Sequence, residues 1–313
     1  MTLPTEAFAL AQRWLFETCV QPVMYALGAA GHLEWAFDAT EWLLVGVIEI
    51  VLLWLVLGTL ERRFPAEPVR DRDAVRTDIG YTLLHRLGGF TIFAFVLLQP
   101  WIDELEAALR LVGLSRFQLD ALWPGVTDVA WVSFAIYLVV FDLADYWLHR
   151  WQHTWRWWWA LHALHHSQRQ MTFWSDQRNH LLDDLLRDAA FALLGVAVGV
   201  PPGQFVLLVV ASRVLQSVQH ANLRLRYPGG VERLLVSPSF HRRHHAIDYG
   251  HAGRRHGCNF AVLFPIWDVL FGTADFRDGF VPTGIADQLD GRDYGRGFWA
   301  QQWLGLARLL NRR

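Results

Sequence analysis

Histidines at helical spacing are the most informative feature of this 313-residue chain, because their type and pattern point to metal chemistry. Residues three or four positions apart lie on one face of an α-helix, so such histidines can aim their imidazoles at one place. If buried without a metal, each of these rings would need another polar partner. The pattern therefore predicts a metal centre built from imidazole nitrogen. It consists of one HxxxH pair and two HxxHH triplets: His149 and His153; His162, His165 and His166; His241, His244 and His245.

Two carboxylates share a helical stripe with the first pair. Asp142, Asp145, His149 and His153 stand at offsets of 0, 3, 7 and 11 residues, which keeps them on one face. A metal-bound imidazole usually donates its other N–H to a carboxylate or a carbonyl. We expect the two aspartates to hydrogen-bond to the ligands rather than to bind the metal. For Asp145, a plain charge at a helix end explains the residue equally well.

The composition indicates a membrane protein. Hydrophobic residues make up 53% of the chain, and the mean hydropathy of +0.18 is high for a soluble protein. The formal net charge of -2 gives no sign of a nucleic-acid partner. Cys19 and Cys258 cannot form a disulfide framework, which fits a reducing compartment.

Long apolar segments predict how the chain crosses the membrane, since about 20 apolar residues match the hydrocarbon thickness. Segments 42–60, 81–100 and 129–148 predict three spans, and Arg86 near the start of the second span can snorkel to the interface. Segment 185–218 is interrupted by the sequence VPPG and predicts a hairpin inside or across the membrane.

Charged residues between these spans predict the orientation. Arginines cluster between the first two spans and after the third, whereas segment 101–127 carries several acidic residues against only Arg110 and Arg116. The positive-inside rule puts the arginine-rich segments, and with them every histidine group, in the cytoplasm. We therefore expect a multi-pass integral membrane protein of a bacterial inner membrane.

Five segments, in this order, resemble the fatty acid hydroxylase, or sterol desaturase, superfamily: DLADYWLHRWQH at 142–153, LHALHHS at 161–167, QHAN at 219–222, PSFHRRHH at 238–245 and WDVLFGT at 267–273. The resemblance implies an integral-membrane enzyme whose cytosolic di-iron centre is held by histidines. It also implies a reaction in which O2 oxidises C–H bonds of lipids.

Together, the spans and the resemblance predict the fold class: an all-α integral membrane protein with about four transmembrane helices, three spans plus the membrane hairpin. A cytosolic helical cap then holds the di-metal site. We expect one membrane domain over 1–313, with a fatty acid hydroxylase-like catalytic core at 128–275. Segments 1–40 and 296–313 are expected to form interfacial or peripheral helices.

Carried over residue by residue, the resemblance implies nine metal ligands and no further catalytic or cofactor-binding residue. The ligands are His149, His153, His162, His165, His166, His220, His241, His244 and His245. His180 and Asn222 are expected beside the ligands, because Asp183 and Asp184, one turn after His180, favour a hydrogen-bonding role for that ring. Segment 246–257 departs from the family pattern, so we expect His251 and His256 to be loop residues near the site.

The leading functional prediction is a di-iron monooxygenase that hydroxylates a fatty acyl, sterol or other isoprenoid lipid. A lipid desaturase or methyl oxidase on the same site is the alternative. A metal transporter or metal-storage membrane protein is the alternative from a different class, but the spans hold only Glu49 deep inside. The chain has no G-x-G-x-x-G or CxxCH motif, so electrons are expected from a separate ferredoxin- or cytochrome-type donor with its reductase.

Tryptophans crowd the segment between the first two histidine groups: Trp155, Trp157, Trp158 and Trp159. Tryptophan is enriched at membrane interfaces, where its ring meets the headgroups. An interfacial aromatic belt therefore explains these residues better than the lining of a substrate tunnel does, although some of them can serve both purposes.

Overall fold

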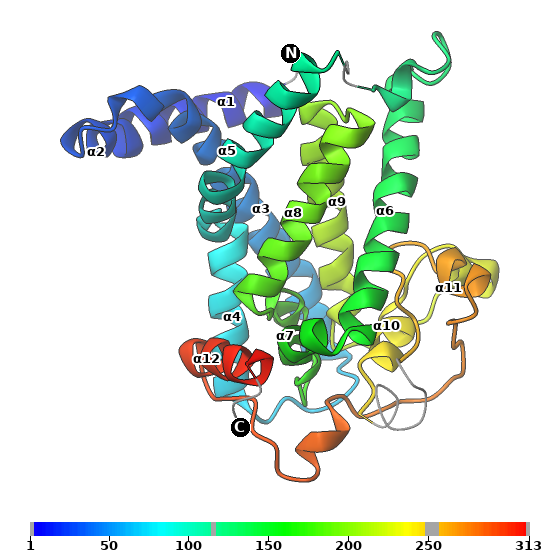
Figure 1. Ribbon diagram of the computed structural model, residues 1–313. Coiled ribbons are helices and arrows are strands. Elements are labelled where there is room, and N and C mark those ends of the chain that lie inside the picture. The colour runs from blue at the N-terminus through cyan, green and yellow to red at the C-terminus, as the bar shows by residue number, and fades with distance from the viewer. Residues whose placement is uncertain (1–2, 114–116, 248–256, 311–313) are drawn as a thin grey trace.

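The structure is a computed structural model that describes residues 3–113, 117–247 and 257–310 (Figure 1). Within these ranges every regular element is a helix, and the only β-type pairings are two isolated antiparallel bridges. The predicted all-α class is confirmed.

Long helices stand side by side and run between the two ends of the molecule (Figure 1). They are α3 (Leu33–Arg63), α4 (Arg72–Arg86), α5 (Gly89–Leu111), α6 (Ala130–Thr154), α8 (Leu181–Val198) and α9 (Pro202–His220). Apolar side chains bind these helices to one another; Tyr137 and Phe141 of α6, for example, pack against Leu208 of α9. Because antiparallel neighbours alternate, the ends of α3, α6 and α9 meet the starts of α4 and α8 at one end.

Length and composition qualify two helices of the described chain as membrane spans, Ala30–Arg63 and Ala130–Thr154. The predicted span 42–60 lies within the first of them, and the predicted span 129–148 overlaps the second in all but its first residue. The pair α4 and α5 is a third candidate only if it crosses as one bent unit. The predicted hairpin exists as α8 and α9, but α8 carries four charged residues, so a fourth crossing remains a prediction.

The predicted second span, 81–100, is not one continuous helix, because the chain bends by 48° between α4 and α5. Gly88 causes the break: its φ of +85° lies in the left-handed region, which a right-handed helix cannot continue. Gly46 of α3 allows a close approach to the bend, since a Cβ there would lie 1.7 Å from the carbonyl oxygen of Arg86. Hydropathy does not report backbone direction, so it missed the bend.

Arg86 does not snorkel to an interface; it is buried and ties four elements together. Its Nη1 donates to Glu49 Oε2 of α3 at 2.6 Å, and its Nη2 donates to Asp176 Oδ2 at 2.9 Å and to Ser217 Oγ of α9 at 2.6 Å. The Arg86 side chain is 0% exposed and that of Glu49 is 5% exposed. The one acidic residue deep in the first span is thus paired, which a single-segment hydropathy argument could not show.

Short helices cover the end of the bundle at which α6 and α9 finish (Figure 1). They are α7 (Arg156–His166), α10 (Pro238–His244), α11 (Ile266–Leu270), α12 (Phe298–Leu309) and the 3-10 turns η4 (Phe173–Gln177), η5 (Gly229–Arg233) and η6 (Ala286–Gln288). α12 packs on α7 with Gln301 and Gln302 buried, while Trp299 and Trp303 face outward. These short helices cover the end of the bundle, where the sequence predicts a helical cap. The location of this end in the cytoplasm remains a prediction.

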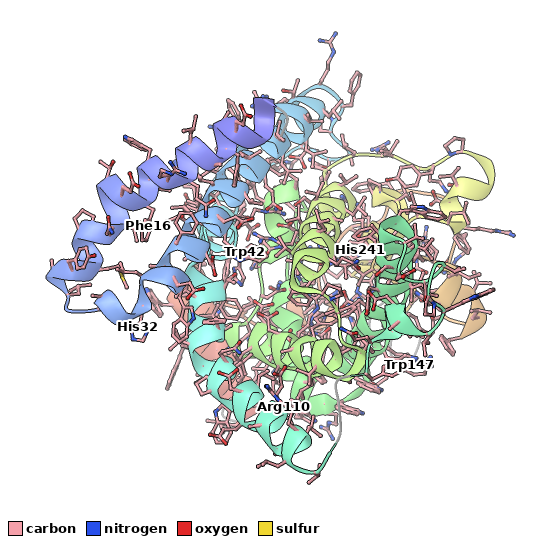
Figure 2. The ribbon with its side chains drawn as sticks, turned by 90° about the horizontal axis from the view of Figure 1, so that it is seen from above. Phe16, His32, Trp42, Arg110, Trp147 and His241 are labelled. Atoms are coloured by element: carbon pink, nitrogen blue, oxygen red, sulfur yellow. The ribbon has the colours of Figure 1, made fainter. Side chains whose placement is uncertain are left out.

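At the opposite end, the N-terminal helices form an arm that projects sideways from the bundle (Figures 1 and 2). The arm consists of α1 (Leu3–Leu15), the π-helical turn η1 (Phe16–Val20), α2 (Gln21–Ala26) and the 3-10 turn η2 (Ala30–His32); a further 3-10 turn, η3 (Leu119–Ala121), precedes α6. Leu10, Trp14 and Leu27 are exposed on the arm. This placement suits an interfacial helix, although the predicted range 1–40 also includes the start of α3.

Replacing Arg86 by Met is expected to lower the free energy of unfolding by about 3–5 kcal/mol, because Glu49 and Asp176 would lose their buried counter-charge. Thermal unfolding of the detergent-solubilised protein measures this. Arg76→Met is the matched control, since Arg76 and its partner Asp73 are exposed. Equal melting temperatures for the two variants would contradict the assigned role of Arg86.

Candidate metal centre

The histidine groups come from the ends of four helices that meet at the capped end of the bundle (Figure 1). α7 follows α6 directly, because Trp155 adopts an extended conformation (φ -88°, ψ 117°) that ends one helix before the next begins. Figure 2, viewed along the bundle, places His241 among the helix ends rather than at the rim. The contributions are His149 and His153 from α6, His162, His165 and His166 from α7, His220 from α9, and His241, His244 and His245 from α10 and its C-cap.

These nine histidines gather into two adjoining groups, each able to hold a metal ion. The first group is His149, His153, His162 and His166; the second group is His165, His220, His241 and His245; and His166, His244 and His245 form a bridging set. Within each set the available nitrogens lie within 4.8 Å of one another. No ring is more than 7% exposed. The nine residues named from the sequence are thus brought together, and their binding to metal remains a prediction.

Hydrogen bonds at Nδ1 turn the Nε2 atoms of several rings inward. His149 Nδ1 donates to the Phe260 carbonyl at 2.7 Å, and His244 Nδ1 donates to the Cys258 carbonyl at 2.7 Å. His220 Nδ1 donates to the carbonyl of Gln216 at 2.8 Å. A neutral imidazole that carries its proton on Nδ1 has a bare lone pair on Nε2, which is the form that binds metals.

The inward-facing nitrogens lie close to one another, as metal ligands do. His220 Nε2 lies 3.2 Å from His165 Nε2 and 3.1 Å from His241 Nε2. In the other half of the site, His244 Nε2 lies 3.1 Å from His166 Nε2. His220 has already used its proton on Gln216, so its lone pair faces its neighbours without a proton of its own to share. A cation between such lone pairs turns their repulsion into coordination, so this donor set fits metal ions.

Burial keeps the ligand candidates of the cap neutral. For His165, His166, His241 and His245, burial lowers the pKa well below the usual value of 6.5, and neighbouring imidazoles lower it further. A second positive charge in such a site would be repelled by the first. The rings therefore carry the free lone pair that a metal requires near neutral pH.

Asp183 is the carboxylate that orients a ligand candidate, and sequence reasoning missed this role. Its Oδ2 accepts from His162 Nδ1 at 2.9 Å, and its Oδ1 accepts from Gln152 Nε2 at 2.7 Å and from Trp158 Nε1 at 2.6 Å. Asp183 lies on α8, one turn after His180, so the sequence signal was present. The sequence shows only that Asp183 lies close to His180. Its contact with His162 depends on the packing of α8 beside α7, which the sequence pattern does not reveal.

The two aspartates expected to orient imidazoles have other partners. Asp145 pairs with Arg187, with its Oδ1 3.0 Å from Nε and its Oδ2 2.5 Å from Nη2. Asp142 accepts from the backbone N–H of Leu263 at 2.8 Å and from Trp267 Nε1 at 2.8 Å. Asp142 therefore acts on His149 indirectly. It holds the segment around Leu263, and the carbonyl of Phe260 in the same segment accepts the hydrogen bond from His149.

His180 and Asn222 lie outside both histidine groups. His180 accepts from the Leu182 N–H at 3.1 Å and donates through Nε2 to the Gln302 carbonyl at 2.9 Å, so it caps α8 and ties it to α12. Asn222 pairs through its amide with both backbone groups of Glu67. Neither side chain contacts a ligand candidate by these bonds. His251 and His256 lie outside the described residues.

A cavity of about 360 Å³ lies between α5, α6, α8 and α9 and leads to the histidines. Phenylalanines, leucines and other apolar residues line most of it, including Phe95, Leu138, Phe191 and Leu208. A smaller cavity of about 50 Å³ lies against the rings of both histidine groups. The two cavities share a polar collar, defined by the residues that line both: Asp145, Asp176, Asn179, Asp184, Arg187 and Gln216.

Asp142, Asp188 and Arg213 also line the larger cavity. In the described part of the chain, Arg213 Nε and Nη2 are buried without a hydrogen-bond partner, although Nη2 lies 3.5 Å from Glu49 Oε2. A buried donor without a partner is costly unless a ligand or water satisfies it. The cavity next to the candidate metal centre therefore offers unpaired hydrogen-bond donors to a polar group of a ligand.

Acidification is expected to destabilise the metal-free protein. Below pH 6.5 the unfolded chain takes up protons on histidines whose folded-state pKa is lowered, so the free energy of unfolding falls as pH falls. The measurement is the melting temperature of metal-stripped protein between neutral and mildly acidic pH. His241→Gln should flatten this dependence, whereas His32→Gln, which removes an exposed ring, should not. A melting temperature that rises on acidification would contradict the assignment.

Comparison with known proteins finds a family model and several enzymes that resemble this chain. Residues 134–273 match the sequence model of the fatty acid hydroxylase family. The chain is 28% identical over 229 residues to alkylglycerol monooxygenase of Danio rerio, covering 72% of this chain and 45% of that protein. It is 28% identical over 247 residues to the alkylglycerol monooxygenase of Homo sapiens, covering 78% and 48%.

A third relative extends the similarity to another lipid enzyme. Methylsterol monooxygenase 1-3 of Arabidopsis thaliana is 24% identical over 173 residues, which cover 53% of this chain and 54% of that protein. The chain spans about half the length of the curated relatives it matches. None of the solved structures matches the chain significantly. The segment that supplies all nine clustered histidines thus matches the model of a fatty acid hydroxylase domain.

Proposed function

We propose that this protein is a membrane-bound, O2-dependent di-iron monooxygenase that hydroxylates a C–H bond of a lipid. The single observation that supports this most strongly is the convergence of nine buried imidazoles beside a small cavity that shares part of its lining with a larger, mainly apolar cavity. Relatives named as monooxygenases of alkylglycerols and methylsterols support the same reaction class. All-nitrogen donor sets suit iron and leave positions open for oxygen.

The proposed ligands divide between two ions. His149, His153, His162, His166 and His244 would hold one ion, and His165, His220, His241 and His245 would hold the other. When bound, the two ions supply the redox chemistry that activates O2 and removes hydrogen from the substrate carbon. The chain supplies the rest: Asp183 and backbone carbonyls keep protons on Nδ1, and burial excludes bulk water from the site.

The cavity supports an uncharged, hydroxyl-bearing lipid as the substrate. An alkyl chain would occupy the apolar part between α5, α6, α8 and α9. A hydroxyl group would be held near the polar collar, where Arg213 offers unused donors and Asp188 offers an acceptor. The lining contains five aspartates against two arginines, so a carboxylate or phosphate headgroup would be repelled. Alkylglycerols and sterols, the lipids in the relatives' names, have uncharged hydroxylated heads.

The orientation and the electron supply complete the proposal. We infer that the capped end faces the cytoplasm, because the arginine-rich segments 62–76 and 150–169 lie at that end. A bacterial inner membrane would place a soluble donor of the ferredoxin or cytochrome type, with its reductase, on the same side. The hairpin of α8 and α9 would then be the fourth crossing, shielded from lipid on its charged face.

A desaturase or methyl oxidase would use the same centre, and a transporter or storage protein would bind metal without chemistry. Glu49, the only acidic residue deep in the first span, is paired with Arg86 and so is poorly placed to pass an ion. Product analysis separates the remaining possibilities, since hydroxylation adds an oxygen atom and desaturation adds none.

The deciding experiment uses purified protein loaded with Fe(II), a reductant, ¹⁸O2 and an alkylglycerol, a methylsterol or a free fatty acid. We expect ¹⁸O in the product of a hydroxylated neutral lipid, and no oxidation of the fatty acid. His165→Ala should lose the ion of the second group together with the product, whereas His32→Ala should keep both. Iron binding without O2 consumption would contradict an oxygenase and favour storage.

Arg213→Leu tests the head-binding role of the collar. The lost hydrogen bond should raise the KM for the preferred hydroxylated lipid about tenfold, or about 1.4 kcal/mol, with a smaller change in kcat. A substrate analogue without the hydroxyl should be affected less. Arg110→Leu, on the exposed end of α5, is the control. An equal loss for both substrates would show that Arg213 supports the fold and not the headgroup.

A further inference from the structure

A stack of tryptophan rings runs from the surface to the interior where α6 passes into α7. Trp151 and Trp155 stack with centroids 5.2 Å apart and planes 5° from parallel. Trp155 and Trp157 each approach Trp158, at 5.7 Å and 5.1 Å. Trp151, Trp155 and Trp157 are 37%, 44% and 46% exposed, whereas Trp158 is 5% exposed. The rings therefore form a continuous aromatic path across the wall of the cap.

The inner end of this path is hydrogen-bonded to the metal centre. Trp158 Nε1 donates to Asp183 Oδ1 at 2.6 Å, and Asp183 Oδ2 accepts from His162 Nδ1 at 2.9 Å. His162 belongs to the first histidine group. One carboxylate thus bridges an indole and a proposed iron ligand, so two hydrogen bonds connect His162 to the tryptophan stack.

An interfacial belt explains only part of this arrangement. It accounts for three half-exposed rings, but a belt does not require a fourth ring buried behind them or its bond to Asp183. Packing alone would be served equally well by phenylalanine, which lacks the N–H. Indole is among the side chains most easily oxidised by one electron, and rings in contact exchange electrons readily. The geometry is that of an electron path.

We propose that Trp158, with Trp155, Trp157 and Trp151 outside it, is a one-electron relay between the metal centre and the protein surface. This inference rests on the proposed di-iron function. Trp158 gives one electron to the oxidised centre and becomes an indole radical cation. Trp157 or Trp155 refills Trp158 with one electron. A reduced iron–sulfur or haem protein then gives one electron to the exposed ring and is itself oxidised by one electron. The electron that the metal centre receives is thus supplied by this external protein, and every tryptophan returns to its original state.

Asp183 makes Trp158 suitable for this step. The carboxylate accepts hydrogen bonds from three donors, Gln152, Trp158 and His162. One of its oxygen atoms lies against the indole N–H, where it stabilises the positive charge that forms on the ring. When the lipid is absent, the relay would carry oxidising equivalents outward, away from the histidines.

The test uses iron-loaded protein given reductant and O2 without lipid, so that oxidising equivalents have no substrate. Peptide mass spectrometry measures oxidised tryptophan at positions 151, 155 and 157, and electron paramagnetic resonance of frozen samples measures the tryptophan radical. We expect both signals in the unaltered protein. Trp158→Phe should reduce them to the level of an anaerobic sample at unchanged iron content, and Trp158→Tyr, with an oxidisable ring, should restore part of them.

Two further variants separate a relay from a structural effect. Trp299→Phe removes an exposed ring on α12 that stacks with no other tryptophan and should leave the signals unchanged. The double variant Trp155→Phe with Trp157→Phe leaves Trp158 and Asp183 intact; the radical should then remain while oxidation at Trp151 disappears. Undiminished oxidation of the outer rings in Trp158→Phe overturns the relay alone. Unaltered protein that binds no iron or consumes no O2 overturns the proposed function and the relay with it.

Discussion

The mutual approach of nine imidazoles in one buried space is the constraint on which this structure depends. Nitrogen lone pairs about 3 Å apart repel each other, and protonation would add repulsion between cations. Only a rigid frame keeps such groups together before a metal arrives. Hydrogen bonds at the far side of four of the rings form this frame. His149, His244 and His220 donate to the carbonyls of Phe260, Cys258 and Gln216, and His162 donates to Asp183.

Buried charge serves two different purposes in the bundle. Around Arg86 of α4, the carboxylates of Glu49 on α3 and Asp176 on η4 pair with the guanidinium and hold the bent pair α4 and α5 against its neighbours. Around the polar collar, compensation is incomplete: Asp145 and Arg187 pair, but Arg213 keeps unused donors toward the cavity. A buried ion pair holds packed helices together, whereas an unpaired donor beside a cavity is suited to a ligand. The two networks adjoin at Asp176 and Glu49, so the proposed lipid site and the helix packing share residues.

The metal centre lies between two routes of different chemistry. The apolar cavity reaches it from within the bundle, between α5, α6, α8 and α9. The tryptophan stack reaches it through the wall of the cap and Asp183. A lipid oxygenase needs a dry route for its substrate and a separate route for electrons, because a shared route would expose the reacting carbon to water and to the donor.

The sequence by itself determined the all-α class, the first and third spans and the nine histidines, because hydrophobic runs and helical spacing are local patterns. It placed Asp142, Asp145, His180 and Asn222 near the site, but it could not assign their partners. Only the tertiary structure decided that Asp183 orients His162, that Arg86 is buried, and that α4 and α5 bend. Each of these depends on contacts between segments far apart in the chain, and such contacts leave no periodicity in either segment.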